Sequence, residues 1–360
     1  MEKSEYLHIA SRKTFAEENN MDLNNWINIL QCPLCSGDLV SNESTLTCHS
    51  CRKTFPVHFG IPDFRLFPPD HVGYRSEEKD LELSAYLFDR LETSTFEELV
   101  HIYVKRGSGH LDQVLRSRYI RYRLDNHVRA KKLVMQIQNQ DFFRFPDTGE
   151  SFGLDIGCGS GCGISALLEL GLSAIGADIS ISELIIAKSF LKNYYPENNY
   201  FLIAGVAEHM PFRNEFFSHV LAVDVIEHVL DQKQFIRDVY RVLHPDGCFY
   251  FDTCSRFVWD EPHTALPAVG YLPRFLQPLY VRMARQRNYK IHLPSQWELK
   301  KWLNESPFDN WKIIYNQIDK ASRPRTWRGK VIRTIPGLLH LRNLLLKHTS
   351  SFEIFMKKSS

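Results

Sequence analysis

From residue 151 onward, short apolar runs alternate with amphipathic stretches. The apolar runs predict strands at residues 152–156, 173–177, 200–203, 219–223 and 248–252. Between them, apolar residues recur at helical spacing over residues 164–170, 183–193 and 232–243. Strands that alternate with helices at this spacing form parallel sheets covered on both faces. The pattern therefore predicts an α/β fold in this part of the chain.

The remainder of this region predicts a helix at 295–303, a strand at 311–317 and a last strand at 352–356. Two stretches that interrupt the alternation are predicted as insertions, at residues 256–293 and 320–349. The second mixes basic, apolar and aromatic residues without an acidic one. This mixture suits contact with an anionic membrane surface, phosphate contacts to RNA, or a plain helical cover over the sheet.

The N-terminal half predicts three smaller parts. Residues 1–28 favour a helical arm, 29–67 a compact cysteine-rich segment, and 77–145 a helical segment that caps the α/β domain, which we place at 146–360. The helix around residues 116–132 is rich in arginine, and we interpret this as a solvent-exposed face.

Composition narrows the class of protein. The chain of 360 residues has a net charge of +2, which gives no general argument for nucleic-acid binding. The first twenty residues contain no apolar signal segment, and no apolar run approaches the roughly 20 residues that span a bilayer. We therefore expect a cytoplasmic protein, and any contact with a membrane through residues 320–349 would be peripheral. In a cytoplasmic protein the eight cysteines are expected to be metal ligands or buried thiols.

Four of these cysteines form a pattern with a specific meaning. Cys32 and Cys35 make one C-x2-C pair, and Cys48 and Cys51 make a second. Two such pairs supply four thiolates to a tetrahedral Zn²⁺ ion, whose closed coordination shell indicates a structural role. The segment that follows, residues 55–63, resembles the end of the zinc ribbon in tRNA-methyltransferase activator proteins. The resemblance implies a zinc ribbon that is also able to contact a protein partner.

The first predicted strand leads into a glycine-rich turn. Asp155 precedes Gly157, Gly159 and Gly161, and a second acid, Asp178, ends the next strand. This segment resembles motif I of class I methyltransferases, which implies S-adenosylmethionine as cofactor. By that resemblance Asp155 helps to hold the methionine amino group, the glycine turn faces the carboxypropyl chain and ribose, and Asp178 accepts the ribose hydroxyls, with Ile179 beside it in the cofactor site.

Three further blocks occur in the order of the same family. Residues 205–212 resemble the loop after its third strand, where Ala207 or Glu208 would meet the adenine because Val206 replaces the usual acid. Residues 223–229 place Asp224 near the methyl donor, and 241–247 resemble the turn before the fifth strand. The chain thus resembles class I methyltransferases of the methyltransferase-11 or ubiquinone-biosynthesis type, which implies a seven-stranded Rossmann-like sheet with a terminal antiparallel strand beside strand five.

The identity of the methyl acceptor is less clear from the sequence. An alcohol, phenol or protonated amine needs a general base, for which His263 is the first candidate and His228 the second. We expect transfer to an oxygen or nitrogen atom of a small-molecule, glycan or lipid-linked acceptor. The alternatives are an RNA base, which the near-neutral charge makes less favoured, and a non-catalytic scaffold that binds S-adenosylmethionine.

Overall fold

The computed structural model describes residues 26–42, 44–66, 76–107, 113–141, 151–195, 200–286, 288–316 and 351–359. Most of the predicted N-terminal arm and the whole predicted insertion at 320–349 therefore lie outside the described residues. None of the described helices is both long enough and apolar enough to cross a membrane.

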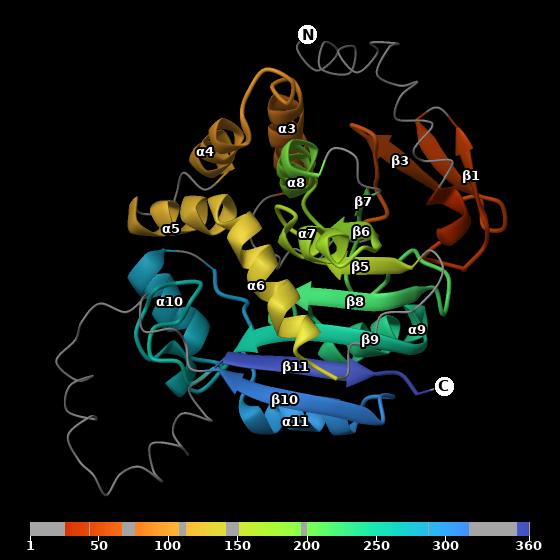
Figure 1. Cartoon of the computed structure of the whole chain (residues 1–360). Coiled ribbons are helices and arrows are strands. Elements are labelled where there is room, and N and C mark those ends of the chain that lie inside the picture. The colour runs from red at the N-terminus through yellow and green to blue at the C-terminus, as the bar shows by residue number, and fades with distance from the viewer. Residues whose placement is uncertain are drawn as a thin grey trace, which may run out of the picture.

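The centre of the molecule is a seven-stranded sheet (Figure 1). In chain order its strands are β5 (Phe152–Ile156), β6 (Ser173–Asp178), β7 (Tyr200–Ala204), β8 (Phe217–Val223), β9 (Leu243–Cys254), β10 (Asn310–Asn316) and β11 (Ser351–Lys357). In space they run β10-β11-β9-β8-β5-β6-β7. The last strand, β11, pairs antiparallel with β9 on one side and β10 on the other. The Rossmann-like sheet with its terminal antiparallel strand is therefore confirmed.

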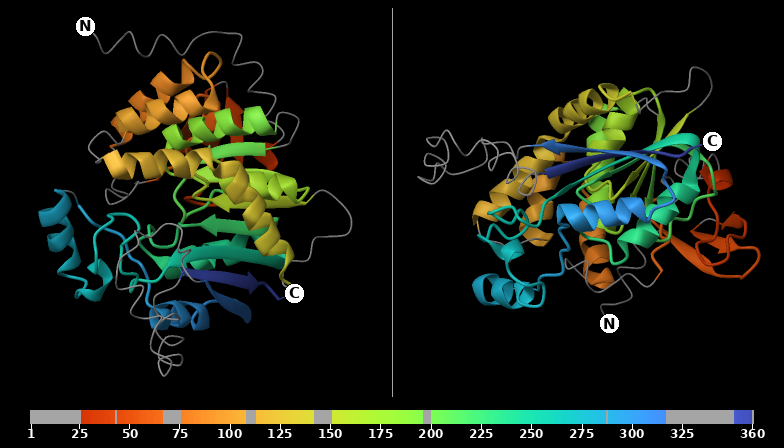
Figure 2. Two further views of the ribbon diagram at one scale, coloured as in Figure 1. Left: turned by 60° about the vertical axis from the view of Figure 1, so that its left-hand side comes forward. Right: turned by 90° about the horizontal axis from the view of Figure 1, so that it is seen from below.

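Helices cover both faces of this sheet (Figure 2). The apolar sides of α9 (Gln232–Val242) and α11 (Gln296–Asn304) pack into one core. On the opposite face, α7 (Cys162–Glu169) and α8 (Ile181–Tyr194) belong to a second core. This arrangement buries both sides of the central strands, which explains why those strands are continuous apolar runs in the sequence.

A group of four helices lies over α7 and α8. These are α3 (Glu77–Phe88), α4 (Phe96–Gly107), α5 (Gln113–Leu124) and α6 (Asn126–Gln138). The helices α3 and α4 pack on α8, and α6 packs on α7. One sequence interpretation needs correction here, because the arginine-rich helix is not uniformly solvated. Arg123 is buried and ion-pairs with Glu183 of α8, whereas Arg118 and Arg121 are exposed.

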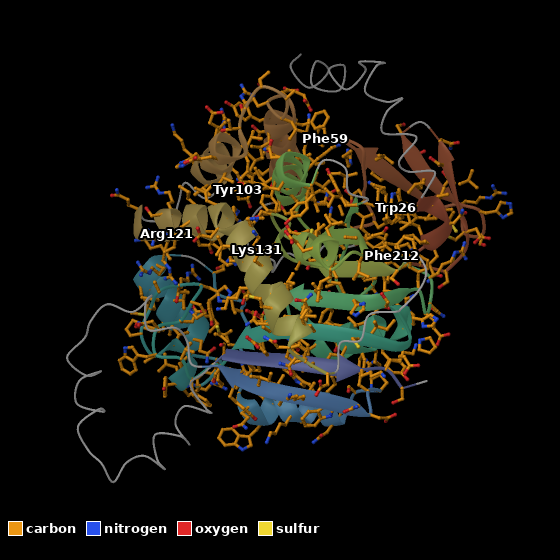
Figure 3. All side chains as sticks on the ribbon, in the orientation of Figure 1. Trp26, Phe59, Tyr103, Arg121, Lys131 and Phe212 are labelled. Carbon is orange, nitrogen blue, oxygen red and sulfur yellow. The ribbon has the colours of Figure 1, made fainter. Side chains whose placement is uncertain are left out.

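The cysteine segment forms a separate small sheet of β1 (Leu39–Asn42), β2 (Thr45–Cys48), β3 (Thr54–His58) and β4 (Ile61–Pro62). It lies against β7, the edge strand of the large sheet, where the backbone of Phe64 donates to the carbonyl oxygen of Ala204 at 2.8 Å. Trp26 stacks on Phe201 with ring centroids 5.5 Å apart, and Figure 3 shows Trp26 and Phe212 on this side of the large sheet. The small sheet thus covers an edge that would otherwise expose unpaired backbone groups.

Candidate active site

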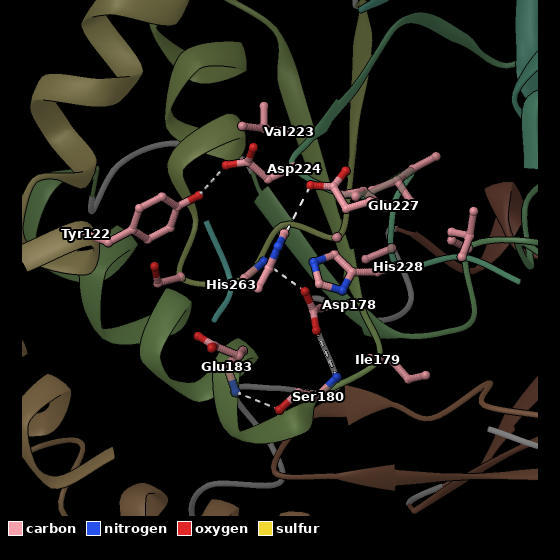
Figure 4. A pocket seen from close by; sticks show the side chains of 18 of the residues that line it. Tyr122, Asp178, Ile179, Ser180, Glu183, Val223, Asp224, Glu227, His228 and His263 are labelled. Atoms are coloured by element: carbon pink, nitrogen blue, oxygen red, sulfur yellow. Dashed lines mark hydrogen bonds and ion pairs between the residues drawn. The ribbon is translucent and has the colours of Figure 1, made fainter. Parts of the chain in front are cut away.

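A cavity of about 510 Å³ lies at the carboxyl ends of the parallel strands. Its wall includes the last residues of β5, β6 and β8 and the loops that follow them. The helices α4 and α5, which belong to the group of four helices over α7 and α8, close another side through Tyr103 of α4 and four residues of α5. Parallel α/β sheets bind ligands at this edge, and the volume is in the range of small-molecule and cofactor sites. Figure 4 shows part of the cavity lining.

The glycine turn after β5 depends on the absence of side chains at two positions. Gly157 has a φ of +66°, and a Cβ atom there would lie 2.4 Å from the side chain of Val225. A Cβ atom at Gly163 would lie 2.5 Å from the carboxylate of Asp155. Because Gly163 leaves this space, Asp155 reaches the start of α7 and accepts a hydrogen bond from the backbone N–H of Ile164 at 2.9 Å. Asp155 therefore lies behind the turn, holding it, and does not line the cavity.

Asp178, the last residue of β6, lines the cavity. One carboxylate oxygen accepts from the backbone N–H of Gly159 at 2.9 Å, and the other from that of Ser180 at 2.8 Å. These two bonds fix the carboxylate between the glycine turn and the start of α8. Burial, with a smaller contribution from Glu183, raises the pKa of Asp178 to about 7. The carboxylate is thus oriented and costly to ionise without a partner in the cavity.

The loop after β8 brings a second acid to the cavity. Asp224 has a φ of +57°, uncommon for a residue with a side chain, and its backbone N–H donates to Asp252 at 2.8 Å. The hydroxyl of Tyr122, from α5, donates to the Asp224 carboxylate at 3.1 Å. The guanidinium of Arg129 in turn lies over the Tyr122 ring. The cap helix therefore reaches the residue that was expected near the methyl donor.

His263 lies in a network of carboxylates. Its Nδ1 atom is 2.8 Å from Glu261 and its Nε2 atom is 3.9 Å from Glu227, and both acids are buried. Burial favours the neutral imidazole, but the hydrogen bond and charge of Glu261, with the charge of Glu227, outweigh it and raise the pKa of His263. Burial first, and then the charge of Asp224, raises the pKa of Glu227 to about 7. His263 and Glu227 thus lie at the cavity wall as two groups that can hold a proton, with Glu261 behind the imidazole.

The second predicted histidine lies beside the first. The rings of His228 and His263 are 4.9 Å apart and nearly perpendicular. Ligand atoms of Glu227, His228 and His263 lie within 4.8 Å of one another, so a cation could also bind here. Two other polar side chains of the insertion that carries His263 do not line the cavity, since Tyr271 donates to the carbonyl oxygen of Phe257 and His292 lies near Glu298.

Most of the residues predicted for the site lie together around the cavity. The predicted residues that line it are Gly157, Gly159, Asp178, Ile179, Ala207, Glu208, Asp224, His228 and His263. Asp155 and Gly161 are absent from the wall. Sequence reasoning missed the contributions of Tyr122, Arg118 and Glu227. Only Glu227 had a signal, because it directly precedes His228.

The four predicted metal ligands converge in the small sheet. The sulfur atoms of Cys32 and Cys51 are 3.7 Å apart, those of Cys35 and Cys48 are 3.5 Å apart, and all four lie within 4.8 Å of one another. A tetrahedron of sulfur atoms at Zn–S distances of about 2.3 Å has edges of about 3.8 Å. The cluster therefore fits a tetrahedral metal ion.

A polar network joins this segment to the cavity. Arg65, just after β4, pairs with Asp63 and donates to the carbonyl oxygen of Ile179 at 3.1 Å. Asp80, a buried residue of α3, accepts from the backbone N–H of Ile181 at 2.8 Å, and it also accepts from the hydroxyls of Ser180 and Ser182. The loop that follows Asp178 is thus held by Arg65, which follows the small sheet, and by Asp80 of helix α3.

Comparison with known proteins distinguishes the same two parts of the chain, the large sheet and the small cysteine-rich sheet. Residues 154–251 match the family described as methyltransferase domain, and residues 26–60 match the family described as Trm112p-like protein. The ubiquinone biosynthesis O-methyltransferase of Bartonella bacilliformis is 29% identical over 194 residues, which cover 53% of this chain and 74% of that protein. The mitochondrial ubiquinone biosynthesis O-methyltransferase of Rattus norvegicus is 30% identical over 190 residues, covering 51% of this chain and 52% of that protein.

The chain thus spans about half the length of the rat relative. A solved structure from Thermotoga maritima, described as a possible histamine N-methyltransferase, covers 73% of this chain and 99% of its own, with 16% identity and a TM-score of 0.42. A likeness this low carries no information on the acceptor. From the two family matches and the sheet order, the chain contains an S-adenosylmethionine-dependent methyltransferase domain, preceded by a Trm112p-like region with four clustered cysteines.

Proposed function

We propose that the cavity binds S-adenosylmethionine and that the chain methylates an oxygen or nitrogen atom of a small-molecule, glycan or lipid-linked acceptor. Asp178 accepts the ribose hydroxyls, Ala207 and Glu208 lie at the adenine end, and Asp224 lies near the sulfonium. The charge of the cavity wall supports this assignment. Its acids Asp178, Glu183, Glu208, Asp224 and Glu227 exceed its cationic groups, which suits a ligand with a sulfonium and an ammonium group.

Within this proposal His263 is the general base. The bound cofactor supplies a methyl carbon made electrophilic by the sulfonium. His263 removes the proton of the acceptor O–H or N–H while the acceptor atom forms its bond to that carbon and the C–S electron pair passes to sulfur. Glu261 orients the imidazole and Glu227 stabilises its protonated form. The observation that carries this role is the buried Glu261–His263–Glu227 arrangement at the cavity wall.

Replacing His263 with glutamine is expected to lower the rate of methyl transfer by about 100-fold, since the general base is lost. The release of S-adenosylhomocysteine from a screened acceptor measures this rate. In the wild type the rate should rise with pH through a value above 6.5, because only the unprotonated imidazole acts as base and the pKa of His263 is raised. In the variant this rise should be absent.

His228→Gln is the matched control, because His228 lines the same cavity beside His263 but is not the imidazole whose Nδ1 atom lies 2.8 Å from Glu261. We expect it to retain most of the activity. An equal loss in both variants would argue against the specific role of His263. A rate abolished by a chelator and restored by a divalent cation would assign the same side chains to metal binding.

Asp80→Asn is expected to weaken the binding of S-adenosylmethionine about tenfold. The amide would present a donor to groups that already donate, so the loop after Asp178 would lose at least one buried hydrogen bond. Titration calorimetry with S-adenosylhomocysteine measures the effect. Asp89→Asn, an exposed position just after the same helix, is the control and should bind normally. Equal affinities would show that Asp80 has no positioning role.

We infer that the metal of the four-cysteine cluster is zinc. Zinc binds readily to four thiolates in a tetrahedral arrangement, and the Zn²⁺ ion is not redox-active. Because four protein ligands leave no open coordination position, the ion would stabilise the small sheet and take no part in methyl transfer.

A further inference from the structure

The exposed face of α10 (Gln277–Arg285) is unusually apolar. Leu279 and Met283 are 55% and 77% exposed, and Phe275, in the turn just before the helix, is 78% exposed. Leu279 and Met283 are four residues apart and therefore lie next to one another on one side of the helix, and Phe275 precedes Leu279 by the same interval in the turn. Single exposed apolar side chains are common in proteins, but three along one helix and the turn before it indicate a contact surface.

The chain segment that carries this row has charges of one sign, and one of them, Arg274, ion-pairs with an acid outside the segment, Glu298. From residue 264 to residue 297 the sequence contains no aspartate or glutamate, and its basic residues are Arg274, Arg282, Arg285, Arg287 and Lys290. Arg282 lies on the same face as Leu279, three residues further along the helix. Arg282 and Lys290 are exposed and make no ion pair among the described residues. A segment that exposes apolar and cationic side chains and has no acid of its own is complementary to a layer of anionic lipid headgroups over hydrocarbon.

The insertion that carries α10 is folded around a small hydrophobic core of its own. Leu266, Val269, Val281 and Tyr289 form a small core of their own beneath the helix. Arg285 donates to the carbonyl oxygen of Thr264 at 3.0 Å, which ties the end of α10 back to the start of the insertion. The helix therefore has a proper buried face, and the row of exposed apolar residues is a second, separate face.

The same insertion contributes to the cavity. Pro262 and His263 line the cavity wall, and α10 follows in the chain and projects from the outer side of the molecule (Figure 2, left). A surface that binds α10 would therefore contact the same insertion that contributes His263 to the cavity.

We propose that α10 docks the protein on an anionic membrane surface. The row Phe275, Leu279 and Met283 enters the boundary between headgroups and acyl chains. Arg282 and Lys290 contact the lipid phosphates, the long side chain of Arg282 reaching up from the apolar row. Docking does not depend on the identity of the acceptor or on methyl transfer.

The full chain, mixed with vesicles of phosphatidylcholine containing about 30% phosphatidylglycerol, should sediment with them, and should not with phosphatidylcholine alone. The double variant Leu279→Ser/Met283→Ser is expected to lower the partition coefficient at least about tenfold, because two buried apolar side chains are lost. Arg282→Glu/Lys290→Glu should lower it similarly and remove most of the dependence on salt.

The matched control is Val128→Ser/Met135→Ser, which removes two side chains that are 68% and 66% exposed on α6. It should bind vesicles as the wild type does, and all variants should bind S-adenosylhomocysteine normally if they are folded. Three results would overturn the proposal. These are no binding of wild type to anionic vesicles, equal binding by the Leu279/Met283 variant, or a loss of self-association in that variant, which would make a second copy the occupant.

Discussion

Replacing Asp178 with alanine should lower the affinity for S-adenosylmethionine by about 100-fold or more. A hydrogen bond to a charged acceptor contributes about 1.5–3 kcal/mol, and one carboxylate can accept both ribose hydroxyls. The backbone N–H groups of Gly159 and Ser180 already hold this carboxylate in place, so its side chain loses little conformational entropy when the ligand binds. Alanine would remove the acceptor and leave both N–H groups without their partner.

The same carboxylate should make binding depend on pH. Burial raises the pKa of Asp178 to about 7, and only the ionised form accepts from both hydroxyls. Affinity should therefore be full above pH 7 and should fall as the pH drops through that value, where the carboxylate takes up a proton. In Asp178→Asn, which cannot titrate, the affinity should be low and nearly constant over the same range.

Titration calorimetry with S-adenosylhomocysteine tests both expectations. Asp260→Ala, an exposed acid in the insertion, is the control for loss of a negative charge and should bind normally. Unchanged affinity in Asp178→Ala would remove the ribose assignment and with it the placement of the cofactor. The vesicle test of α10 would be unaffected by that result.

The predicted site residues that line the cavity belong to local sequence patterns. A strand with an acid just before its last residue, followed by glycines, is recognisable because each position has its own requirement within a few residues. Gly157 shows this, since its positive φ and its approach to Val225 exclude a side chain. The order of β5, β6 and β8 then brings Asp178 and Asp224 to one edge of the sheet.

The direction in which a side chain points is harder to predict. Asp155 and Gly161 belong to the same short segment as Gly157 and Gly159, yet they do not line the cavity. The deciding contact is that of Asp155 with the N-terminus of α7, in the space left by Gly163. The sequence contains both residues, but only the fold brings them together.

Long-range partners explain the other differences. Arg123 was expected in solvent, but Glu183, sixty residues further along, neutralises it beneath the cap. Tyr122 reaches Asp224 across an even longer separation in the chain. No helical periodicity contains this information, because it depends on how α5 crosses the end of the sheet.

The cysteine spacing predicted a metal site but not where the small sheet would dock. Its docking on β7 depends on Trp26 and Phe64, neither of which belongs to the cysteine pattern. An edge strand with free backbone groups is a favourable place for a second sheet to bind. The four-cysteine cluster and the edge of the methyltransferase sheet are therefore coupled through one apolar core.

This coupling leads to the second large effect, which is expected from Cys48→Ser. Serine is a poor ligand for a soft thiolate site, so the protein should be isolated without bound zinc. Structural zinc contributes about 10 kcal/mol or more in small domains, and a sheet of four short strands has little core of its own. The small sheet should therefore unfold, and the melting temperature of the whole chain should fall by about 10 °C or more as β7 loses its cover.

Metal analysis and calorimetric unfolding of the full chain measure the two parts of this expectation. Ser50→Ala, an exposed position in the same cysteine pair, is the control and should keep both the metal and the melting temperature. A wild type without metal would remove the zinc site. A variant that lost its metal but melted like the wild type would mean that Trp26 and Phe64 hold the small sheet on β7 unaided, and that the four cysteines serve another purpose.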